Sequence, residues 1–92
     1  MRILVTPTFE RTVKKLHRQQ KVVLDEAVRT IASQPDIGEA KAADLIGIRV
    51  YKFRMDNLLC LLAYRVLDEN TLKLLMVGPH ENFYRNLKRT EH

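Results

Sequence analysis

The residues best suited to chemistry in this sequence lie near its C-terminal end, in the segment VGPHENFYRNLKR, residues 77–89. This segment contains His80, and histidine is the side chain best suited to accept or donate a proton in catalysis. Four residues later comes Tyr84, a phenol that can stack on a nucleobase or donate a proton. Three basic residues complete the segment: Arg85, Lys88 and Arg89.

Three further cations lie in a second segment, RVYKFR, residues 49–54. Because successive side chains of a strand point to opposite faces, Lys52 and Arg54 are expected on one face and Arg49 on the other. A proton-transferring pair and several cations are what metal-independent cleavage of RNA requires, since the reaction needs a base, an acid and charge stabilisation at the phosphate. The pattern therefore indicates a candidate site in which His80 and Tyr84 act together with Lys52, Arg54 and the three basic residues of the closing segment.

Each of these residues also has an ordinary structural interpretation. A histidine at the start of a helix is more often a cap than a catalyst, and Tyr84 could pack beneath Lys88. Lys52 and Arg54 could form a solvated strand edge. The first helical segment carries a basic row that is typical of a solvated face, with a secondary role in steering toward RNA: Arg11, Lys14, Lys15 and Arg18.

The closing segment is predicted to be a helix that positions the histidine and the tyrosine. A Gly-Pro pair at residues 78–79 predicts that the helix begins at residue 79 and runs to about residue 89, since proline needs no donor at the first helical position. This start places His80 in the first turn, where the helix dipole disfavours imidazolium. Phe83 and Leu87 lie four residues apart and are expected to enter the core.

The other elements follow from hydrophobic periodicity. Residues 2–6 predict a strand, and Thr6 with Pro7 predicts the cap and first turn of a helix that continues through Leu16. A second helical pattern covers residues 21–36, so the polar residues 17–21 are expected to join the two helices as an antiparallel hairpin. Residues 36–47 lack a clear period and are interpreted as a loop. Three antiparallel strands are then expected at residues 48–54, 58–66 and 71–78, with turns at 55–57 and 67–70.

The resulting architecture is an α+β fold: an N-terminal strand, a two-helix hairpin, a three-stranded antiparallel meander and a short C-terminal helix. Residues 1–92 are expected to form one domain, because a chain this short builds a single core. The sequence has 16 Lys and Arg against 11 Asp and Glu, a formal net charge of +5, which favours polyanionic partners such as nucleic acid.

The cysteine, membrane and metal patterns limit the class of protein further. Cys60 is the single cysteine, so an internal disulfide and a cysteine zinc cluster are excluded, and its apolar surroundings indicate a core residue. No apolar run approaches the length of about 18 residues that a membrane span requires. Metal-binding motifs and glycine-rich phosphate loops are absent from the sequence. We therefore expect a cytoplasmic protein that uses no metal or other cofactor.

The order of these elements and two segments, LIGIRVYKFR and LLAYRVLDENTLKLLMVGPHENFYRNLKR, resemble the RelE/ParE superfamily of toxins from bacterial type II toxin-antitoxin systems. The most specific matches are the strand with Lys52 and Arg54, the Y-x-V-x-D turn from Tyr64, and the VG-x-H-x-x-x-Y pattern that ends at Tyr84. The resemblance covers nearly the whole chain. It implies a helical hairpin packed on a small, mostly antiparallel sheet, and a cognate antitoxin that wraps around the toxin.

The resemblance implies one of two activities. RelE-like members are ribosome-dependent mRNA interferases, which cleave RNA without metal by attack of a ribose 2′-hydroxyl on its own 3′-phosphate. ParE-like members inhibit DNA gyrase and lack those catalytic residues. For cleavage, the resemblance implies His80 as general acid or base, Tyr84 for stacking or proton donation, and Lys52 with Arg54 for phosphate stabilisation. Further RNA contacts are expected from Arg49, Arg65, Arg85, Lys88 and Arg89.

One segment departs from the RelE pattern. The middle strand of RelE-like members carries an inward arginine where this chain has LLCLL, residues 58–62, so one phosphate contact is missing unless Arg65 or Arg85 replaces it. We favour mRNA cleavage, with gyrase inhibition and a noncatalytic nucleic-acid or protein-binding module as alternatives. Free sheet edges and an apolar groove beside the helical hairpin are expected to accept a helix or strand from a small acidic antitoxin.

Overall fold

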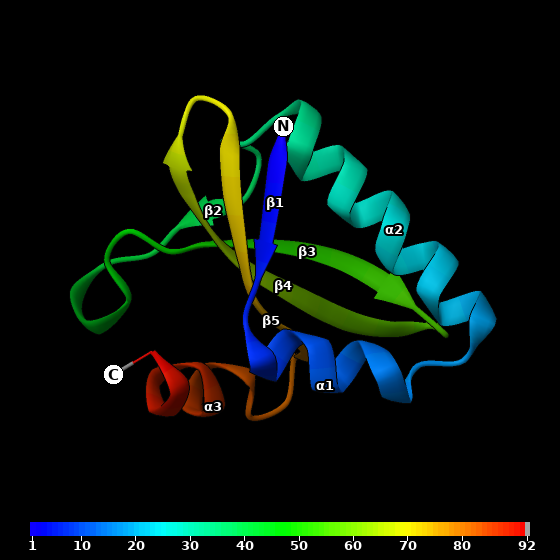
Figure 1. Ribbon diagram of the computed structural model, residues 1–92. Helices are drawn as coiled ribbons and strands as arrows, with labels where there is room; N and C mark the ends of the chain where they lie inside the picture. Colours follow the sequence, from blue (N-terminus) through cyan, green and yellow to red (C-terminus); the bar gives the residue numbers. More distant parts are fainter. Residues whose placement is uncertain (92) are drawn as a thin grey trace.

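The computed structural model of the protein describes residues 1–91, which form one mixed sheet with helices on both faces (Figure 1). The five strands lie in the order β1-β5-β4-β3-β2. Their bounds are β1 Arg2–Val5, β2 Glu39–Ala40, β3 Arg49–Met55, β4 Leu58–Asp68 and β5 Thr71–Pro79. The helices are α1 Pro7–Lys15, α2 Arg18–Ser33 and α3 Phe83–Thr90, with a 3-10 turn at Ala43–Leu45.

The predicted α+β fold and its antiparallel meander are confirmed. β3 pairs with β4 and β4 pairs with β5, both antiparallel, while β1 lies parallel to β5 at the edge of the sheet. The tight β3–β4 connection consists of Asp56 and Asn57, whose φ angles are 53° and 64°. Two positive φ values are what a two-residue hairpin turn requires to match the twist of its strands.

Two hydrophobic layers hold the helices on opposite faces of the sheet. The first layer packs α1 and α2 on the sheet and contains Phe9, Leu24, Ile31, Leu62 and Leu72. The second layer packs α3 and the 3-10 turn on the other face and contains Leu45, Ile48, Leu75, Phe83 and Leu87. Phe83 and Leu87 are 1% and 0% exposed, which confirms the prediction that they enter the core.

The middle strand β4 contributes to both layers, as its uniformly apolar sequence predicts. Leu62 faces α1 and α2, whereas Leu61 and Ala63 face α3. Cys60 is buried, and desolvation raises the pKa of its thiol. The predicted role of Cys60 as a core residue is therefore confirmed.

The predicted start of α1 is correct, but that of α2 is three residues too late. The Thr6 hydroxyl accepts a hydrogen bond from the Phe9 N–H at 3.1 Å, so Thr6 caps α1. α2 begins at Arg18, because the Gln20 side chain accepts a hydrogen bond from the His17 N–H at 3.0 Å. The polar residues interpreted as a corner thus form the first turn of the helix. The two helices diverge from this short connection (Figure 1).

The predicted loop at residues 36–47 contains regular structure. Glu39 and Ala40 pair with Val50 and Arg49, which adds β2 to the edge of the sheet. Leu45 in the following 3-10 turn is buried under α3. Both elements are too short to produce a recognisable hydrophobic period, and both depend on partners distant in the sequence.

The predicted start of the closing helix is wrong. Residues 78–79 end β5, and α3 begins at Phe83 after Asn82, which has a φ of 61°. The His80 N–H donates to the Leu59 carbonyl at 3.0 Å and so continues the β4–β5 pairing beyond Pro79. His80 therefore lies at the end of a strand, and the expected effect of a helix dipole on its imidazole does not apply.

None of the helices within residues 1–91 is long and apolar enough to cross a membrane.

Candidate functional site

The candidate site lies on the face of the sheet that carries α3, at the end where β5 terminates. Lys52 pairs with Leu61, and Leu61 pairs with Gly78. Arg54 pairs with Leu59, whose carbonyl accepts the hydrogen bond from His80. Because residues directly opposite in an antiparallel pair point to the same face, these two rows bring the β3 cations and the histidine to one surface.

Tyr84 joins this surface from α3. Its ring lies edge-to-face with that of His80, with centroids 6.3 Å apart and an interplanar angle of 85°. Phe83 contacts Tyr84 in the same manner at 5.7 Å and is itself buried, so it anchors the first turn of the helix. The half-buried Tyr84 and the exposed His80 therefore sit side by side at the rim of the core.

The floor between the β3 cations and His80, formed by Leu61 and Gly78, is apolar and is open only above Gly78. Leu61, which lies between Lys52 and Gly78, is 0% exposed and belongs to the layer under α3. A Cβ atom placed on Gly78 would meet no atom within 4 Å. Lys52, Arg54 and His80 are exposed. Free space therefore lies above Gly78, on the face of the sheet that Lys52, Arg54 and His80 share. The Arg54 guanidinium donates to the Asn57 carbonyl of the β3–β4 turn at 3.4 Å.

A cation that the sequence analysis did not single out, Lys41, lies beside the phenol. Its Nζ is 4.9 Å from the centroid of the Tyr84 ring, and it forms an ion pair with Glu39. The hydrogen bond to Glu39 raises the pKa of Lys41. Glu39 has a lowered pKa, because Lys41 binds it and the charge of Lys52 also acts on it. Lys41 also lines a pocket of about 260 Å³ with Leu45, Tyr84 and Lys88, among others.

The backbone that carries Glu39 and Lys41 is fixed by Tyr64 and Arg49. The buried Tyr64 hydroxyl donates to the Pro35 carbonyl at 2.7 Å and accepts from the Gly38 N–H at 3.0 Å. Arg49 donates to the Gly38 carbonyl at 2.7 Å. A Cβ atom at Gly38 would lie 2.6 Å from the Tyr64 oxygen, so glycine is required for this close approach. Burial raises the pKa of the Tyr64 phenol.

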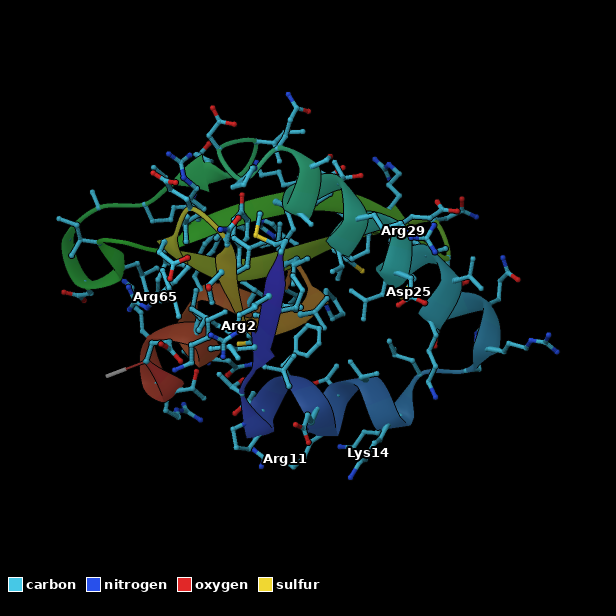
Figure 2. The ribbon with its side chains drawn as sticks, turned by 45° about the horizontal axis from the view of Figure 1, so that its top comes forward. Arg2, Arg11, Lys14, Asp25, Arg29 and Arg65 are labelled. Atoms are coloured by element: carbon cyan, nitrogen blue, oxygen red, sulfur yellow. The ribbon has the colours of Figure 1, made fainter. Side chains whose placement is uncertain are left out.

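The cations expected to contact RNA are divided among several places. Arg49 lies on the other face from Lys52, where its guanidinium holds the carbonyls of the segment before β2. Arg65 donates to the Ile46 carbonyl at 3.3 Å and lies 3.8 Å from the carboxylate of Glu91, at the far end of α3 (Figure 2). Neither guanidinium therefore lies on the floor between Lys52 and His80.

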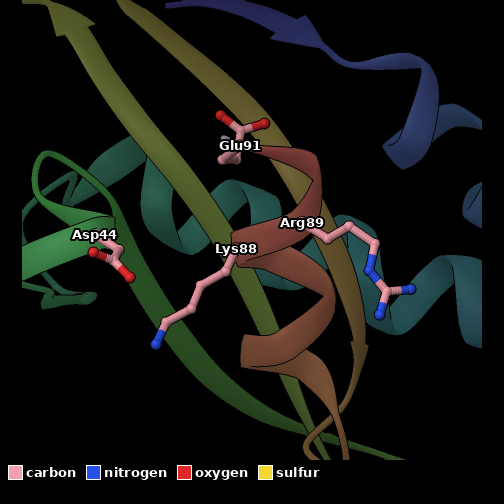
Figure 3. A pocket seen from close by; sticks show the side chains of 4 residues that line it. All are labelled: Asp44, Lys88, Arg89 and Glu91. Carbon is pink, nitrogen blue, oxygen red and sulfur yellow. The ribbon is translucent and has the colours of Figure 1, made fainter.

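The basic residues of α3 itself point in different directions. Lys88 extends from the helix toward the segment that carries Asp44, whereas Arg89 projects to the other side of the helix (Figure 3). These residues and Glu91 border a hollow of about 520 Å³. Arg85 is exposed in the first turn, next to Tyr84. Lys88 shares the pocket of Tyr84 and Lys41 and so borders the candidate site.

Together these features define a small basic α+β protein whose C-terminal helix places a phenol beside a strand-end imidazole and sheet cations. Residues 3–88 match the family described as ParE-like toxin of type II bacterial toxin-antitoxin system. The chain therefore belongs to the ParE-like toxins. No curated protein sequence matches it.

Several solved structures share the fold. The intact RelBE toxin-antitoxin complex of E. coli gives a TM-score of 0.69 at 20% identity, over 87% of this chain and 96% of that chain. A free-state mutant of the E. coli toxin RelE gives 0.73 at 16% identity, over 98% and 92%. The toxin-antitoxin complex RelBE2 of Mycobacterium tuberculosis gives 0.60 at 24% identity, over 86% and 96%. At these identities the similarity establishes the fold alone.

Proposed function

We propose that this toxin is an mRNA interferase, an endoribonuclease that cleaves mRNA on the ribosome without a metal ion and so inhibits translation. The observation that supports the proposal is that strand pairing turns Lys52, Arg54 and His80 to one face of the sheet, where the Tyr84 ring contacts His80. We place this activity in the cytoplasm, where mRNA is translated.

The chemistry divides among these four residues. His80 is the general acid or base, since its imidazole is exposed to a substrate and fixed in orientation by the edge-to-face contact with Tyr84. Tyr84 stacks on a nucleobase or donates a proton to the leaving 5′ oxygen. Lys52 and Arg54 stabilise the charge that develops on the phosphate when the 2′-hydroxyl attacks it. Lys88 and Arg85 are suited to neighbouring phosphates.

Gyrase inhibition is the second candidate, and one feature favours it. Leu61 occupies the middle of the floor, so β4 contributes an apolar side chain between Lys52 and Gly78 where a cation would assist cleavage. A toxin of this family that acts by binding gyrase would not need an intact proton-transferring pair.

Primer extension on cellular mRNA after induction, run beside a gyrase supercoiling assay, distinguishes the two activities. We expect new 5′ ends within translated regions that disappear when translation is blocked, and unchanged supercoiling by gyrase. Intact mRNA together with inhibited supercoiling would establish the gyrase alternative. Intact mRNA with normal supercoiling would exclude both activities, and a noncatalytic binding module would be the remaining candidate.

We also propose that a cognate antitoxin covers apolar surface of this toxin. The free edge strand β1 exposes Ile3, Leu4 and Val5, each 38–39% accessible. An apolar pocket of about 140 Å³ beside the connection of α1 and α2 is lined by Leu16, Met55 and Leu58, among others. An added strand or an amphipathic helix fits these features, and the net charge of +5 favours an acidic partner.

The antitoxin proposal predicts a short reading frame for a small acidic protein next to the toxin gene. Co-expression of that protein should abolish growth arrest, because its binding holds the toxin inactive. The proposal would be contradicted if no such reading frame exists or if the neighbouring protein is basic. Co-expression that leaves growth arrest unchanged would also count against it.

A further inference from the structure

In the candidate site, β3 contributes positively charged side chains, but the neighbouring positions on β4 and β5 carry no charge. Lys52 and Arg54 lie on β3, but the neighbouring position on β4 is Leu61 and the next on β5 is Gly78. Leu61 is fully buried, so the middle of the floor presents no charge. Any further cation for a phosphate held between the β3 cations and His80 would therefore have to come from outside the sheet.

Lys41 is placed to supply that charge. Its ammonium lies over the Tyr84 ring at 4.9 Å, within the distance of about 6 Å over which a cation is attracted to an aromatic face. Its side chain is only 21% exposed, whereas that of its ion-pair partner Glu39 is 63% exposed. The Lys41 side chain is therefore mostly covered and lies against Tyr84, whereas the Glu39 carboxylate faces solvent.

The position of Lys41 is set by backbone contacts on both sides. Its N–H donates to the Ile48 carbonyl at 2.9 Å, directly after the pairing of β2 with β3. Upstream, the two hydrogen bonds of Tyr64 and those of Arg49 fix the chain at Gly38. The segment that carries Lys41 thus has a defined conformation, which a residue that positions a catalytic group requires.

We propose that Lys41 is a positioning and phosphate-binding residue of this site: it orients Tyr84, supplies the cation that the centre of the sheet lacks, and is paired with Glu39 until RNA binds. This inference rests on the proposed cleavage of RNA. It further implies that Glu39 opposes RNA binding, because its carboxylate is paired with Lys41, lies on the same face of the sheet as Lys52, and competes with the incoming phosphate.

The test compares four variants of the full chain: Lys41→Met, Lys41→Arg, Glu39→Gln and Lys21→Met. Methionine keeps the length of the side chain without its charge, and Lys21 is an exposed lysine on α2, on the opposite face of the sheet. Binding of a short single-stranded RNA is measured by fluorescence anisotropy at several salt concentrations. Single-turnover cleavage on ribosomes gives the rate of the chemical step.

Lys41→Met should reduce the slope of log K against log salt by about 0.7, the value for one phosphate contact to a single strand. It should lower the cleavage rate roughly 10- to 100-fold, as expected when a catalytic group is misplaced. Lys41→Arg should restore the slope and part of the rate. Glu39→Gln should tighten RNA binding, and Lys21→Met should match the wild type in slope and rate.

The binding and rate measurements separate this inference from the proposed function. If the wild type binds RNA but does not cleave it, the interferase proposal fails while the salt slope still tests Lys41. A wild-type slope in Lys41→Met, or the absence of RNA binding by the wild type at low salt, would overturn the role of Lys41. A loss of thermal stability in both Lys41→Met and Lys41→Arg with an unchanged slope would show a purely structural role.

Discussion

Replacing His80 by alanine is expected to lower the rate of mRNA cleavage by about 10²- to 10⁴-fold, the contribution typical of a positioned general acid or base. The imidazole is exposed and lies edge-to-face with Tyr84, so its loss removes a proton-transferring group without opening the core. The fold should persist, because the backbone hydrogen bond from residue 80 to Leu59 does not involve the side chain. Induction of the variant should therefore no longer arrest growth.

Two further variants make the His80 result specific. Tyr84→Phe keeps the ring and its contacts with His80 and Phe83 but removes the hydroxyl, so a loss of rate would assign proton donation and an unchanged rate would assign stacking. His17→Ala removes another exposed imidazole, at the start of α2, and should leave cleavage unchanged. Full growth arrest and full cleavage by His80→Ala would contradict the assignment of His80.

Replacing Phe83 by alanine is expected to destabilise the protein by about 3–5 kcal/mol, the usual cost of removing a buried aromatic ring. Phe83 is 1% exposed and packs in the layer beneath α3, while its ring also contacts Tyr84. Because this single ring anchors the first turn of α3, the variant should also lose the fixed position of Tyr84. Equilibrium unfolding in denaturant, followed by circular dichroism, measures the change in free energy of unfolding.

A matched control for Phe83→Ala is Ile46→Ala. Ile46 is a large apolar residue that is 73% exposed, so its truncation should change the free energy of unfolding by no more than about 0.5 kcal/mol. A similar small effect for Phe83→Ala would show that α3 is held to the sheet by contacts other than this ring.

The strands and the first helix could be predicted because their signals are local. Alternation in RVYKFR places Lys52 and Arg54 on one face, and the structure shows this arrangement. Thr6 followed by Pro7 is a strong helix start, and the cap is present. The chain between the two hairpin turns is apolar on both faces and proves to be the middle strand of the meander.

The start of α3 could not be predicted, because a Gly-Pro pair suits the beginning of a helix and the end of a strand equally well. The choice depends on the hydrogen bond between His80 and Leu59, which lie 21 residues apart in the sequence. Proline is tolerated at the end of β5 because β1 pairs with this strand no further than Leu74, so no donor is needed on that side.

The candidate site could be predicted only in part, because some of its residues follow local patterns and others depend on pairing between distant segments. Strand alternation and the spacing near the C-terminus are visible in the sequence, and the structure shows Lys52 and Arg54 on one face and Tyr84 beside His80. The joint role of these four residues in one site stays a prediction. Lys41 was missed, since its position depends on the pairing of β2 with β3 and on the distant Tyr64. The one available signal was the spacing Glu-x-Lys, which places both side chains on the same side of a strand.

The chemistry of the RNA ends tests the central claim most directly. Attack of a ribose 2′-hydroxyl on its own 3′-phosphate leaves a 5′-hydroxyl on one fragment and a 2′,3′-cyclic phosphate on the other. Mapping the ends of mRNA fragments after induction should therefore show 5′-hydroxyl groups, and these fragments should be absent when His80→Ala is induced. Fragments that carry 5′-phosphate groups, or mRNA that remains intact while growth stops, would contradict the account.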